Sequence, residues 1–236
     1  MENVSAPQHS FQRARKPEHK QQRANDLLDA ARRLALAEGV HTVTLTHIAA
    51  QAGVHLSGVR RYFESREEIY LRLAAEGWRE WARAVAQHLR DPRPAGPATP
   101  QVVADAFTRG LAERPLFCDL LAHAQVSLER GVQPGTARDF KVAALDAVDQ
   151  IIEAVHASGA PLEAGAVRDL IAVATSLAGS LWQTAHPAPT LKQIYADDPR
   201  LAHSIVDFEP RLQRLLRVAA RGLAAENAED IENTGQ

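Results

Sequence analysis

The stretch Thr44–Arg66, TLTHIAAQAGVHLSGVRRYFESR, decides the fold of the N-terminal part of this chain. Ile48 lies on the apolar ridge of a helix expected over residues 45–51, and Thr44 can cap its first turn. Gly53 stands where the chain needs a left-handed backbone to turn, which glycine adopts without a steric clash. The stretch is therefore predicted to contain a short, capped helix that ends at a glycine turn.

A second short helix is predicted after the turn, with a basic outer face. Val59 and Tyr62 recur three residues apart, so they are expected to face inward. Ser57, Arg60 and Arg61 then face mainly outward. Small and basic side chains on the second helix of such a pair fit the major groove of DNA. The alternative is an ordinary helical hairpin with a solvated basic surface.

Helices on both sides extend this unit. Upstream, residues 23–37 carry apolar side chains at helical spacing, and Gly39 is expected to end that helix in a left-handed cap. Downstream, Ser65 can cap a long helix whose first turn holds Glu67 and Glu68, where negative charge is favoured. The apolar stripe of this long helix runs through Leu71, Ala74, Trp78, Ala82, Val85 and Leu89.

Over about residues 20–70 the sequence resembles the N-terminal domain of the tetracycline-repressor (TetR) family of transcription regulators. The resemblance is carried by Gly39, by Thr44 with Ile48-Ala49, by Ala52-Gly53-Val54 and by Tyr62-Phe63-x-Ser65-Arg66-Glu67-Glu68-Ile69. It implies a three-helix domain that binds an operator as part of a homodimer, and a larger helical C-terminal domain that holds a small inducer. Repression is the commoner outcome in the family, although an activator would have the same sequence.

The sequence departs from the family pattern at the surface that would meet DNA. Ser57-Gly58 stand where Gly-Thr is common, Arg60 replaces a phosphate-contacting Tyr, and His55 replaces a capping Ser. Arg60 is expected to contact phosphate, with a bidentate contact to guanine as the alternative. For Arg61, base-edge and phosphate contacts both stay open. The predicted DNA-binding residues are Thr44, Thr46, His55, Ser57, Gly58, Arg60, Arg61, Tyr62 and Arg66.

Charge is unevenly distributed along the chain. Residues 1–72 hold 11 Lys and Arg against 8 Asp and Glu, a balance of +3, whereas residues 73–236 hold 16 against 21, a balance of −5. The basic end coincides with the predicted DNA-binding unit. Because residues 1–19 are basic and contain few apolar side chains, we expect a disordered arm there. This arm either contacts DNA phosphates or the minor groove, or only makes the chain more soluble.

The remainder of the chain has helical patterning. The segment DPRPAGPATP, residues 91–100, contains four prolines and predicts a stiff loop between two helices. Further helices are expected at about 101–113, 115–130, 136–158, 163–185 and 208–225, without a competing strand pattern. We therefore predict an all-α protein with a basic arm (1–19), a three-helix helix-turn-helix DNA-binding domain (20–65, motif about 44–63), a larger helical regulatory and dimerisation domain (66–226) and a disordered tail (227–236).

Two C-terminal helices are predicted to pair with their copies in a two-fold homodimer. Each has a stripe of apolar or small side chains, which let helices approach closely. The alternative is that both stripes face the core of the monomer. The candidate interface residues are Ile171, Thr175, Ala178, Gly179, Leu212, Leu215, Leu216, Ala219 and Leu223.

A mostly apolar ligand pocket is predicted in the regulatory domain, with His123 or Gln125 orienting a small effector. Its candidate residues, each of which could also belong to an ordinary core, are Trp78, Trp81, Phe107, Phe117, His123, Gln125, Trp182 and His186. An effector would act by shifting the spacing of the two DNA-binding domains. The alternative is a ligand-independent DNA-binding or nucleoid-associated protein of the same fold.

An enzyme is the remote alternative. The sequence has ten histidines but no HxxH, HExxH or Cys-rich pair, and no glycine-rich phosphate loop after a strand, so we predict no catalytic, metal or cofactor site. A single cysteine, Cys118, excludes an intrachain disulfide, and we find no signal peptide or 18-residue apolar run. We expect a cytoplasmic protein without membrane contact. Its expected partners are double-stranded operator DNA, a second copy of itself and a small-molecule effector.

Overall fold

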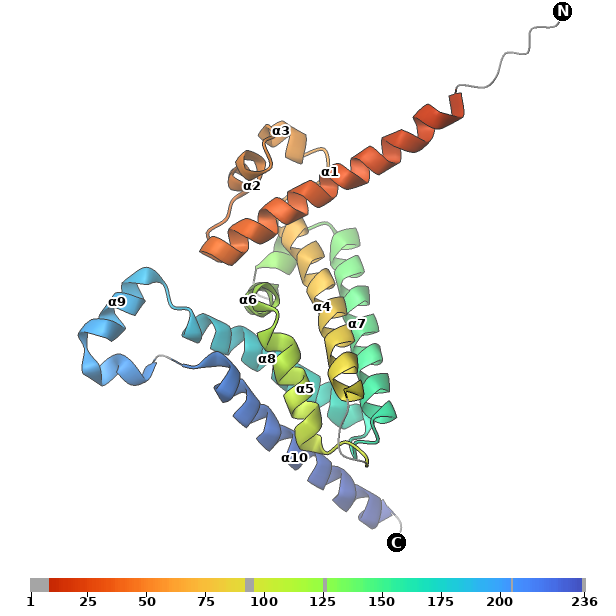
Figure 1. The fold of residues 1–236 in the computed structure, drawn as a ribbon, viewed down its shortest axis with the longest axis vertical. Helices are drawn as coiled ribbons and strands as arrows, with labels where there is room; N and C mark the ends of the chain where they lie inside the picture. The colour runs from red at the N-terminus through yellow and green to blue at the C-terminus, as the bar shows by residue number, and fades with distance from the viewer. Residues whose placement is uncertain (1–8, 92–95, 125–126, 205, 235–236) are drawn as a thin grey trace, which may run out of the picture.

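The computed structural model describes the backbone of residues 9–91, 96–124, 127–204 and 206–234, and their side chains from residue 19 to residue 226 except 202–204. Within these ranges the regular secondary structure is helical and no strand occurs. Figure 1 shows a small group of helices at the N-terminal end, joined to a larger helical body that carries a projecting arm. The predicted all-α class with two helical domains is confirmed.

The N-terminal domain consists of α1 (His9–Glu38), α2 (Leu45–Gln51) and α3 (Leu56–Val59). The bounds of α2 are the predicted ones, and the Thr44 hydroxyl caps it by accepting a 3.2 Å hydrogen bond from the His47 N–H. Gly39 and Gly53 both have positive φ, at 84° and 65°, as expected for the two turns. The local signals of caps and glycines therefore produce the predicted helix-turn-helix.

The outer ends of the chain differ from the prediction. Helix α1 begins at His9, within the segment expected to be a disordered arm, and α10 (Phe208–Thr234) continues into the expected tail. The extension of α1 is rich in Gln, Glu, Lys and Arg, which lose little side-chain entropy in a helix, while the extension of α10 mixes Ala and Glu with less favourable residues. Low apolar content is therefore a poor guide to disorder here. The expectation for residues 1–8 lies outside the described residues.

Helix α4 (Arg66–Arg90) joins the two domains. It begins where predicted: the Ser65 hydroxyl accepts a 3.1 Å hydrogen bond from the Glu68 N–H, and the Glu68 carboxylate accepts a 2.8 Å bond from the Glu64 N–H. The predicted stripe of α4 is buried except for Trp78, which is half-buried. A rigid, well-capped helix therefore passes from the DNA-binding domain into the body.

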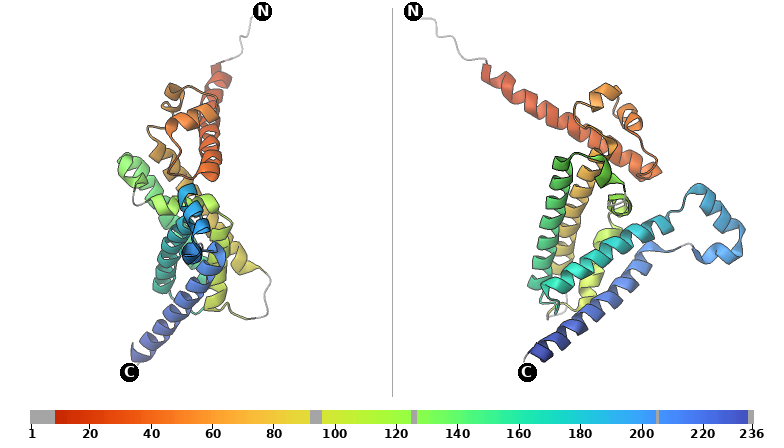
Figure 2. Two further views of the ribbon diagram at one scale, coloured as in Figure 1. Left: turned by 90° about the vertical axis from the view of Figure 1, so that its left-hand side faces the viewer. Right: turned by 180° about the vertical axis from the view of Figure 1, so that it is seen from behind.

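The regulatory domain packs around α4, as the three views in Figures 1 and 2 show. Its helices are α5 (Pro100–Ala112), α6 (Pro115–Ala124), η1 (Leu128–Gly131), α7 (Pro134–Ala157), α8 (Ala164–Ala185), α9 (Pro189–Asp197), η2 (Pro199–Ser204) and α10. Helix α4 lies against α5, α6 and α7, while α8 lies against α6 and α10. Helix α6 thus contacts α4, which enters from the DNA-binding domain, and also α8.

Helices α9 and η2 form an arm that the sequence did not predict. The arm projects away from the body between α8 and α10 (Figures 1 and 2). No residue of α9 is buried, and Leu191 and Ile194 are each 44% exposed. Because the segment has no long apolar period, helical spacing alone does not reveal it. Its start is marked by Pro189 at the first helical position, where proline is favoured.

The sequence has no run of 18 apolar residues, as expected, but the average composition of α8 is close to that of a membrane-spanning helix. By length and composition alone, this helix could cross a membrane. Its apolar positions alternate with small and polar ones, so it does not read as a continuous apolar run. Part of α8 is buried against α6 and α10, as in the core helix of a soluble protein. One such helix is therefore weak evidence for a membrane.

The core of the DNA-binding domain continues into the regulatory domain. One cluster of buried side chains includes the interior of α1 to α3, the first half of α4 and the regulatory residues Leu120, Ala124, Leu128, Phe140 and Ala143. A second cluster fills the space between α4, α5, α7, α8 and α10. The DNA-binding domain is therefore joined to the regulatory domain by the contact of α1 with α6 as well as by α4, whose first half packs against η1 and α7.

Candidate nucleic-acid interface

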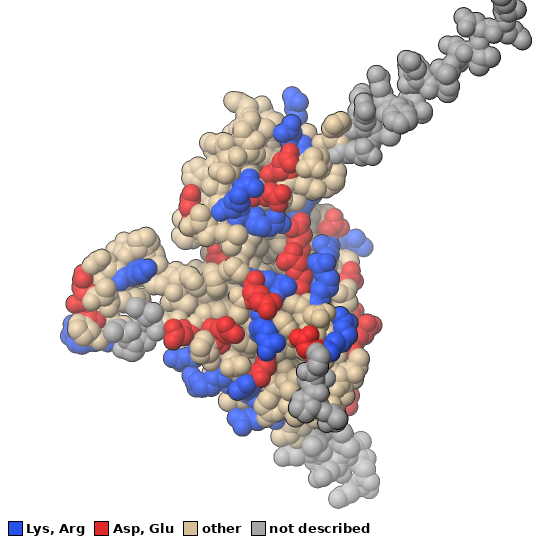
Figure 3. All heavy atoms as spheres, in the orientation of Figure 1, with Lys and Arg blue, Asp and Glu red and all other residues tan. Residues whose placement is uncertain are grey.

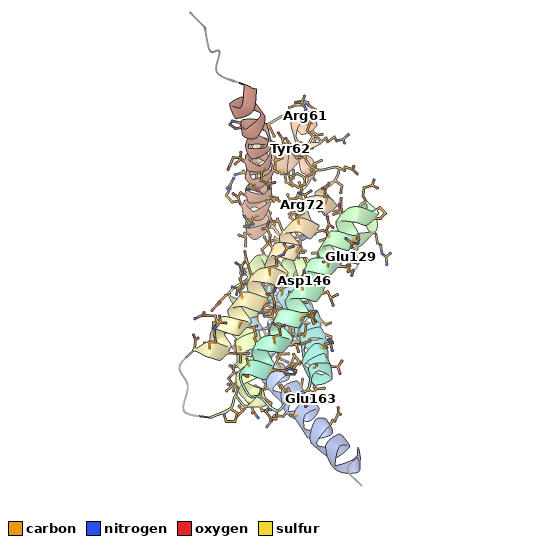
Figure 4. All side chains as sticks on the ribbon, turned by 90° about the vertical axis from the view of Figure 1, so that its right-hand side faces the viewer. Arg61, Tyr62, Arg72, Glu129, Asp146 and Glu163 are labelled. Carbon is orange, nitrogen blue, oxygen red and sulfur yellow. The ribbon has the colours of Figure 1, made fainter. Side chains whose placement is uncertain are left out.

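The outer surface of the helix-turn-helix carries the predicted contact residues at the end of α3. Thr46, Ser57, Arg60 and Arg61 are exposed. Within the part of the chain that the structure describes, no carboxylate forms an ion pair with Arg60 or Arg61, in contrast to Arg72, which pairs with Glu68 at 3.0 Å. Figure 4 shows Arg61 on the outer side of this domain. Two arginine side chains are thus available to a polyanion.

His55 caps α3, in the position where the family pattern has Ser. Its Nδ1 accepts a 3.3 Å hydrogen bond from the Ser57 N–H and lies 3.0 Å from the Ser57 hydroxyl oxygen. The imidazole therefore performs the task of a capping side chain while staying exposed. Thr44 has the equivalent position at α2. Both residues orient the helix-turn-helix, and Gly58 lies half-buried between Ser57 and the buried Val59.

Arg66 is positioned differently from the expectation. Its guanidinium donates hydrogen bonds to the carbonyl oxygens of Val40, at 3.1 Å, and Val43, at 3.0 Å, and it pairs with Glu67 at 3.1 Å. These carbonyls belong to the connection between α1 and α2, which has no helical partners for them. Arg66 therefore fastens that connection to α4, a role that the sequence pattern did not reveal.

Tyr62 faces a groove shared with α1. The groove has a volume of about 460 Å³ and is lined by His19, Lys20, Gln22, Arg23, Asp26 and Tyr62. Tyr62 is half-buried, in agreement with the expectation that its ring belongs partly to the core (Figure 4). Lys20 and Arg23 were not among the predicted site residues. The basic character of the segment before residue 24 was the signal that could have drawn attention to them.

Basic side chains also gather away from this domain. Figure 3 shows Lys and Arg along the edge formed by α10. Arg214, Arg217 and Arg221 line a shallow groove of about 360 Å³ there, and Arg217 pairs with Asp105 at 2.7 Å. The net charge of each half of the chain therefore describes the distribution of charge only coarsely.

Two known protein families match this chain in succession. A model described as "Bacterial regulatory proteins, tetR family" matches residues 27–73, and one described as "Tetracyclin repressor-like, C-terminal domain" matches residues 75–227. The chain belongs to the TetR family. The predicted resemblance is thereby confirmed, and the chain is a DNA-binding transcription regulator rather than an enzyme. TetR regulators are soluble proteins, which agrees with the expected cytoplasmic location.

Solved structures share the fold of this TetR-family chain. A TetR transcriptional regulator from Rhodococcus sp. RHA1 is 20% identical with a TM-score of 0.55, covering 86% of this chain and 95% of its own. The repressor FadR from Thermus thermophilus, solved in complex with lauroyl-CoA, is 21% identical with a TM-score of 0.52, covering 85% and 94%. The regulator PfmR, also from Thermus thermophilus, is 13% identical with a TM-score of 0.52, covering 84% and 98%. No curated protein sequence matches.

The aromatic residues predicted to line a pocket pack against one another instead. The Trp81 ring lies 5.3 Å from the Phe107 ring and 5.6 Å from the Trp78 ring, and Phe117 lies 5.6 Å from Trp78, measured between centroids. The indole N–H of Trp81 donates a 3.3 Å hydrogen bond to the Phe107 carbonyl. These four aromatic side chains therefore fill the interior of the TetR regulatory domain, because edge-to-face packing leaves little space between rings.

The remaining candidate pocket residues lie in two other places. Trp182 and His186 stack on each other at 3.8 Å near the end of α8, where Trp182 also meets Phe208 edge-on at 5.3 Å. His123 lies on α6, with its Nε2 3.4 Å from a carboxylate oxygen of Asp119. Gln125 lies outside the described residues. The structure thus separates the predicted set into an aromatic core, an α8–α10 cluster and a position beside Asp119.

A small cleft lies where the two domains meet. It has a volume of about 160 Å³ and is lined by side chains from α1, α4 and the start of α6, including Arg32, Leu73, Glu76 and Phe117. Arg32 and Glu76 form a 2.6 Å ion pair across it, and burial raises the pKa of Glu76. Drug-sized ligands usually occupy about 300–1,000 Å³, so this cleft is smaller than a typical effector site.

The predicted dimer residues divide between the core and the surface. Ile171, Ala178, Leu212 and Leu216 are buried within this chain, as the monomer-core alternative required. Gly179 faces α6, since a Cβ atom there would lie 2.9 Å from the Ala122 nitrogen. Thr175, Leu215, Ala219 and Leu223 are half-buried and keep part of their surface free. Helical spacing identified the apolar stripes correctly but not which residues of them point outward.

Proposed function

We propose that this chain is a repressor that binds a palindromic operator as a homodimer and is released by a small apolar effector. The observation that carries the proposal is a pair of exposed arginines, Arg60 and Arg61, at the end of the predicted recognition helix. Neither forms an ion pair with a carboxylate of the described residues. Beside them, Tyr62 and the basic residues Lys20 and Arg23 line one groove. This arrangement suits a phosphate chain that passes between α1 and α3 while Ser57 and Arg61 approach base edges.

Arg60 is the residue to test first. With DNA from upstream of its own gene, Arg60→Ala should weaken binding to specific and scrambled sequences alike, because a phosphate contact carries no sequence information. The slope of log affinity against log salt should become shallower by about two per dimer, one for each subunit. Arg138→Ala, an exposed arginine on α7, is the matched control. Loss confined to the specific sequence would instead assign Arg60 to a guanine.

The proposed dimer face is the outer side of α8 and α10. Val173, Leu177, Leu215 and Ala219 are half-buried along the seam between these two helices, and Val218 beside them is 56% exposed. The same face in a second copy would bury these side chains in a four-helix bundle. We also propose that the arm of α9 lies against the partner subunit, because Leu191 and Ile194 are exposed and no residue of α9 is buried in this chain.

Release from DNA would be a shift between two dimer geometries. Recognition helices must be separated by about 34 Å, or a multiple, to enter successive major grooves. An effector that prefers another position of α4 would move the recognition helices off this spacing. For a complete switch, the effector must bind the dimer geometry that does not fit DNA roughly 10⁴-fold more tightly than the geometry that does. In the cytoplasm, where both DNA and metabolites are present, such a protein would couple transcription to the effector concentration.

A second candidate function is regulation without an effector. It is favoured by the aromatic side chains that pack the expected pocket and by the small volume of the cleft between the domains. A screen of apolar compounds by thermal shift, followed by operator release, separates the two functions. A compound that raises the melting temperature and lowers operator affinity supports the sensor. Binding of operator DNA without any responding compound supports the effector-free regulator.

A further inference from the structure

One buried carboxylate touches both domains at their junction. Asp119 lies on α6, is 6% exposed, and belongs to the few buried charged residues of the described chain. Its Oδ2 accepts a 2.8 Å hydrogen bond from the backbone N–H of Val40, in the connection that follows α1. Its Oδ1 accepts a 2.7 Å hydrogen bond from the side-chain amide of Gln183 on α8. A single side chain thus links the DNA-binding domain, α6 and α8.

The surroundings of Asp119 keep it charged. Burial by itself would raise its pKa, but the nearby His123 imidazole and the hydrogen bonds from the Val40 N–H and the Gln183 amide together lower the pKa below its usual value. His123 lies 3.4 Å away and its ring is stacked on that of His41 at 6.2 Å, so the α1–α2 connection also contacts α6 through imidazoles. A carboxylate has only acceptors, which matches the two N–H donors that face it.

The Val40 contact reaches the base of the DNA-binding unit. Val40 is fully buried, and its carbonyl accepts the 3.1 Å hydrogen bond from Arg66 at the first turn of α4. The same peptide segment is therefore held by α4 through Arg66 and by α6 through Asp119. Both attachments add to the packing that orients α1 to α3, and the Asp119 side chain also bonds to α8.

We propose that Asp119 is the positioning residue through which a displacement of α6 or α8 is transmitted to the DNA-binding domain. This inference rests on the proposed function, because it assumes that DNA binding is regulated. If α8 moves with the dimer partner, or α6 with an effector, the carboxylate can keep both bonds only if the Val40 segment follows. Breaking one bond would allow the DNA-binding domain to reorient independently.

The roles of donor and acceptor in the bond between Gln183 and Asp119 can be exchanged by substitution. Gln183→Glu would place two carboxylates side by side and break the α8 bond. Asp119→Asn alone can keep both bonds, because its oxygen can accept from the Val40 N–H while its nitrogen donates to the oxygen of a Gln183 amide turned by half a rotation. In the double variant Asp119→Asn/Gln183→Glu, the new amide at position 119 can accept from the Val40 N–H through its oxygen. Its nitrogen can then donate to the new carboxylate at position 183. The double variant therefore restores both bonds with the roles of the two side chains exchanged.

Domain orientation can be measured within one chain. Spin labels on cysteines introduced at the exposed positions Gln51, on α2, and Gln150, on α7, report the distance between the domains. The native Cys118 is buried, and burial raises its pKa to about 12, so it should stay unlabelled. Labelled chains are diluted into unlabelled protein so that distances between subunits do not contribute. Operator affinity is measured on the same variants.

We expect Gln183→Glu to broaden or shift the distance distribution and to change operator affinity by roughly fivefold or more, a typical coupling, whereas Asp119→Asn should change both less. The double variant should return both to the wild-type values. Unchanged distances in folded Gln183→Glu protein, or a double variant no better than Gln183→Glu, would overturn the inference. If the wild-type protein binds no DNA, the proposed function fails, while the distances still test the coupling.

Discussion

His55 shows how a single replacement can preserve a fold. Its Nδ1 accepts a hydrogen bond from the Ser57 N–H at 3.3 Å, where the related pattern has a hydroxyl oxygen. One of the unpaired amides at the start of a very short helix is thereby satisfied. The recognition surface depends on this cap, because α3 has only four residues and little other local support.

If His55 acts as a cap, two substitutions at this position should differ in their effect on stability. His55→Ala should lower the free energy of unfolding by about 1 kcal/mol, the typical contribution of a capping side chain, while His55→Ser should keep most of it. Urea denaturation followed by circular dichroism measures both variants against the wild type. Equal destabilisation by Ala and Ser would show that the imidazole acts through packing and not through the cap.

The sequence predicted single residues well where a local rule applies, and poorly where the partner is distant. Thr44, Gly53 and Ser65 have the expected capping and turning roles, since their partners lie within four residues. Arg66 was expected at DNA but bonds carbonyls more than 20 residues earlier in the chain. Asp119, whose partners lie 79 and 64 residues away, could not be singled out at all. Hydrogen bonds between distant segments leave no repeating pattern in the sequence, so they cannot be predicted from spacing.

At the scale of elements, the stripe of α4 and the bounds of α2 follow from apolar spacing and caps. The same reasoning failed for α9, which has no buried face. It also placed dimer contacts on Leu212 and Leu216, which α10 directs into its own core. A stripe wide enough for two neighbours looks the same in sequence whether both neighbours belong to one chain or to two.

The dimer proposal makes a prediction about α10. Leu215→Lys should place a charge in the proposed seam and raise the dimer dissociation constant by at least about tenfold, because an unpaired charge is costly to bury. Sedimentation equilibrium measures the effect. Leu145→Lys is the matched control, since Leu145 is 59% exposed on α7, away from α8 and α10. A dimer equally stable in both variants would place the interface elsewhere.

We expect the stability of the protein to depend on pH through Asp119 on α6. Because hydrogen bonds hold the pKa of Asp119 below its usual value, its contribution to stability is complete above the unfolded-state pKa of about 4 and is lost as the pH falls through the lower, folded-state pKa. Unfolding free energies of wild type and Asp119→Asn, measured between pH 3 and 7, should therefore converge toward the acid end. A difference that stays constant over this range would contradict the role of the charge.

For the whole molecule, the arrangement of its two hydrophobic cores bears most directly on function. One core joins the helix-turn-helix to α6, η1 and α7, and the other joins α4 to the C-terminal helices. A movement within the regulatory domain thus has a packed route to the DNA-binding surface. The family and the helical class were predictable from sequence, whereas this continuity across the domain boundary was not, because it depends on buried contacts between distant segments.

Operator recognition is best tested by selecting bound fragments from a random DNA library with the purified, full-length protein. A dimeric TetR regulator should enrich an inverted repeat whose half-sites are centred about one helical turn, or a multiple, apart. Ser57 and Arg61 variants should change the preferred bases, and Arg60→Ala should weaken binding without changing them. Enrichment of no sequence, or of a single unrepeated half-site bound by a monomer, would contradict operator recognition by a dimer.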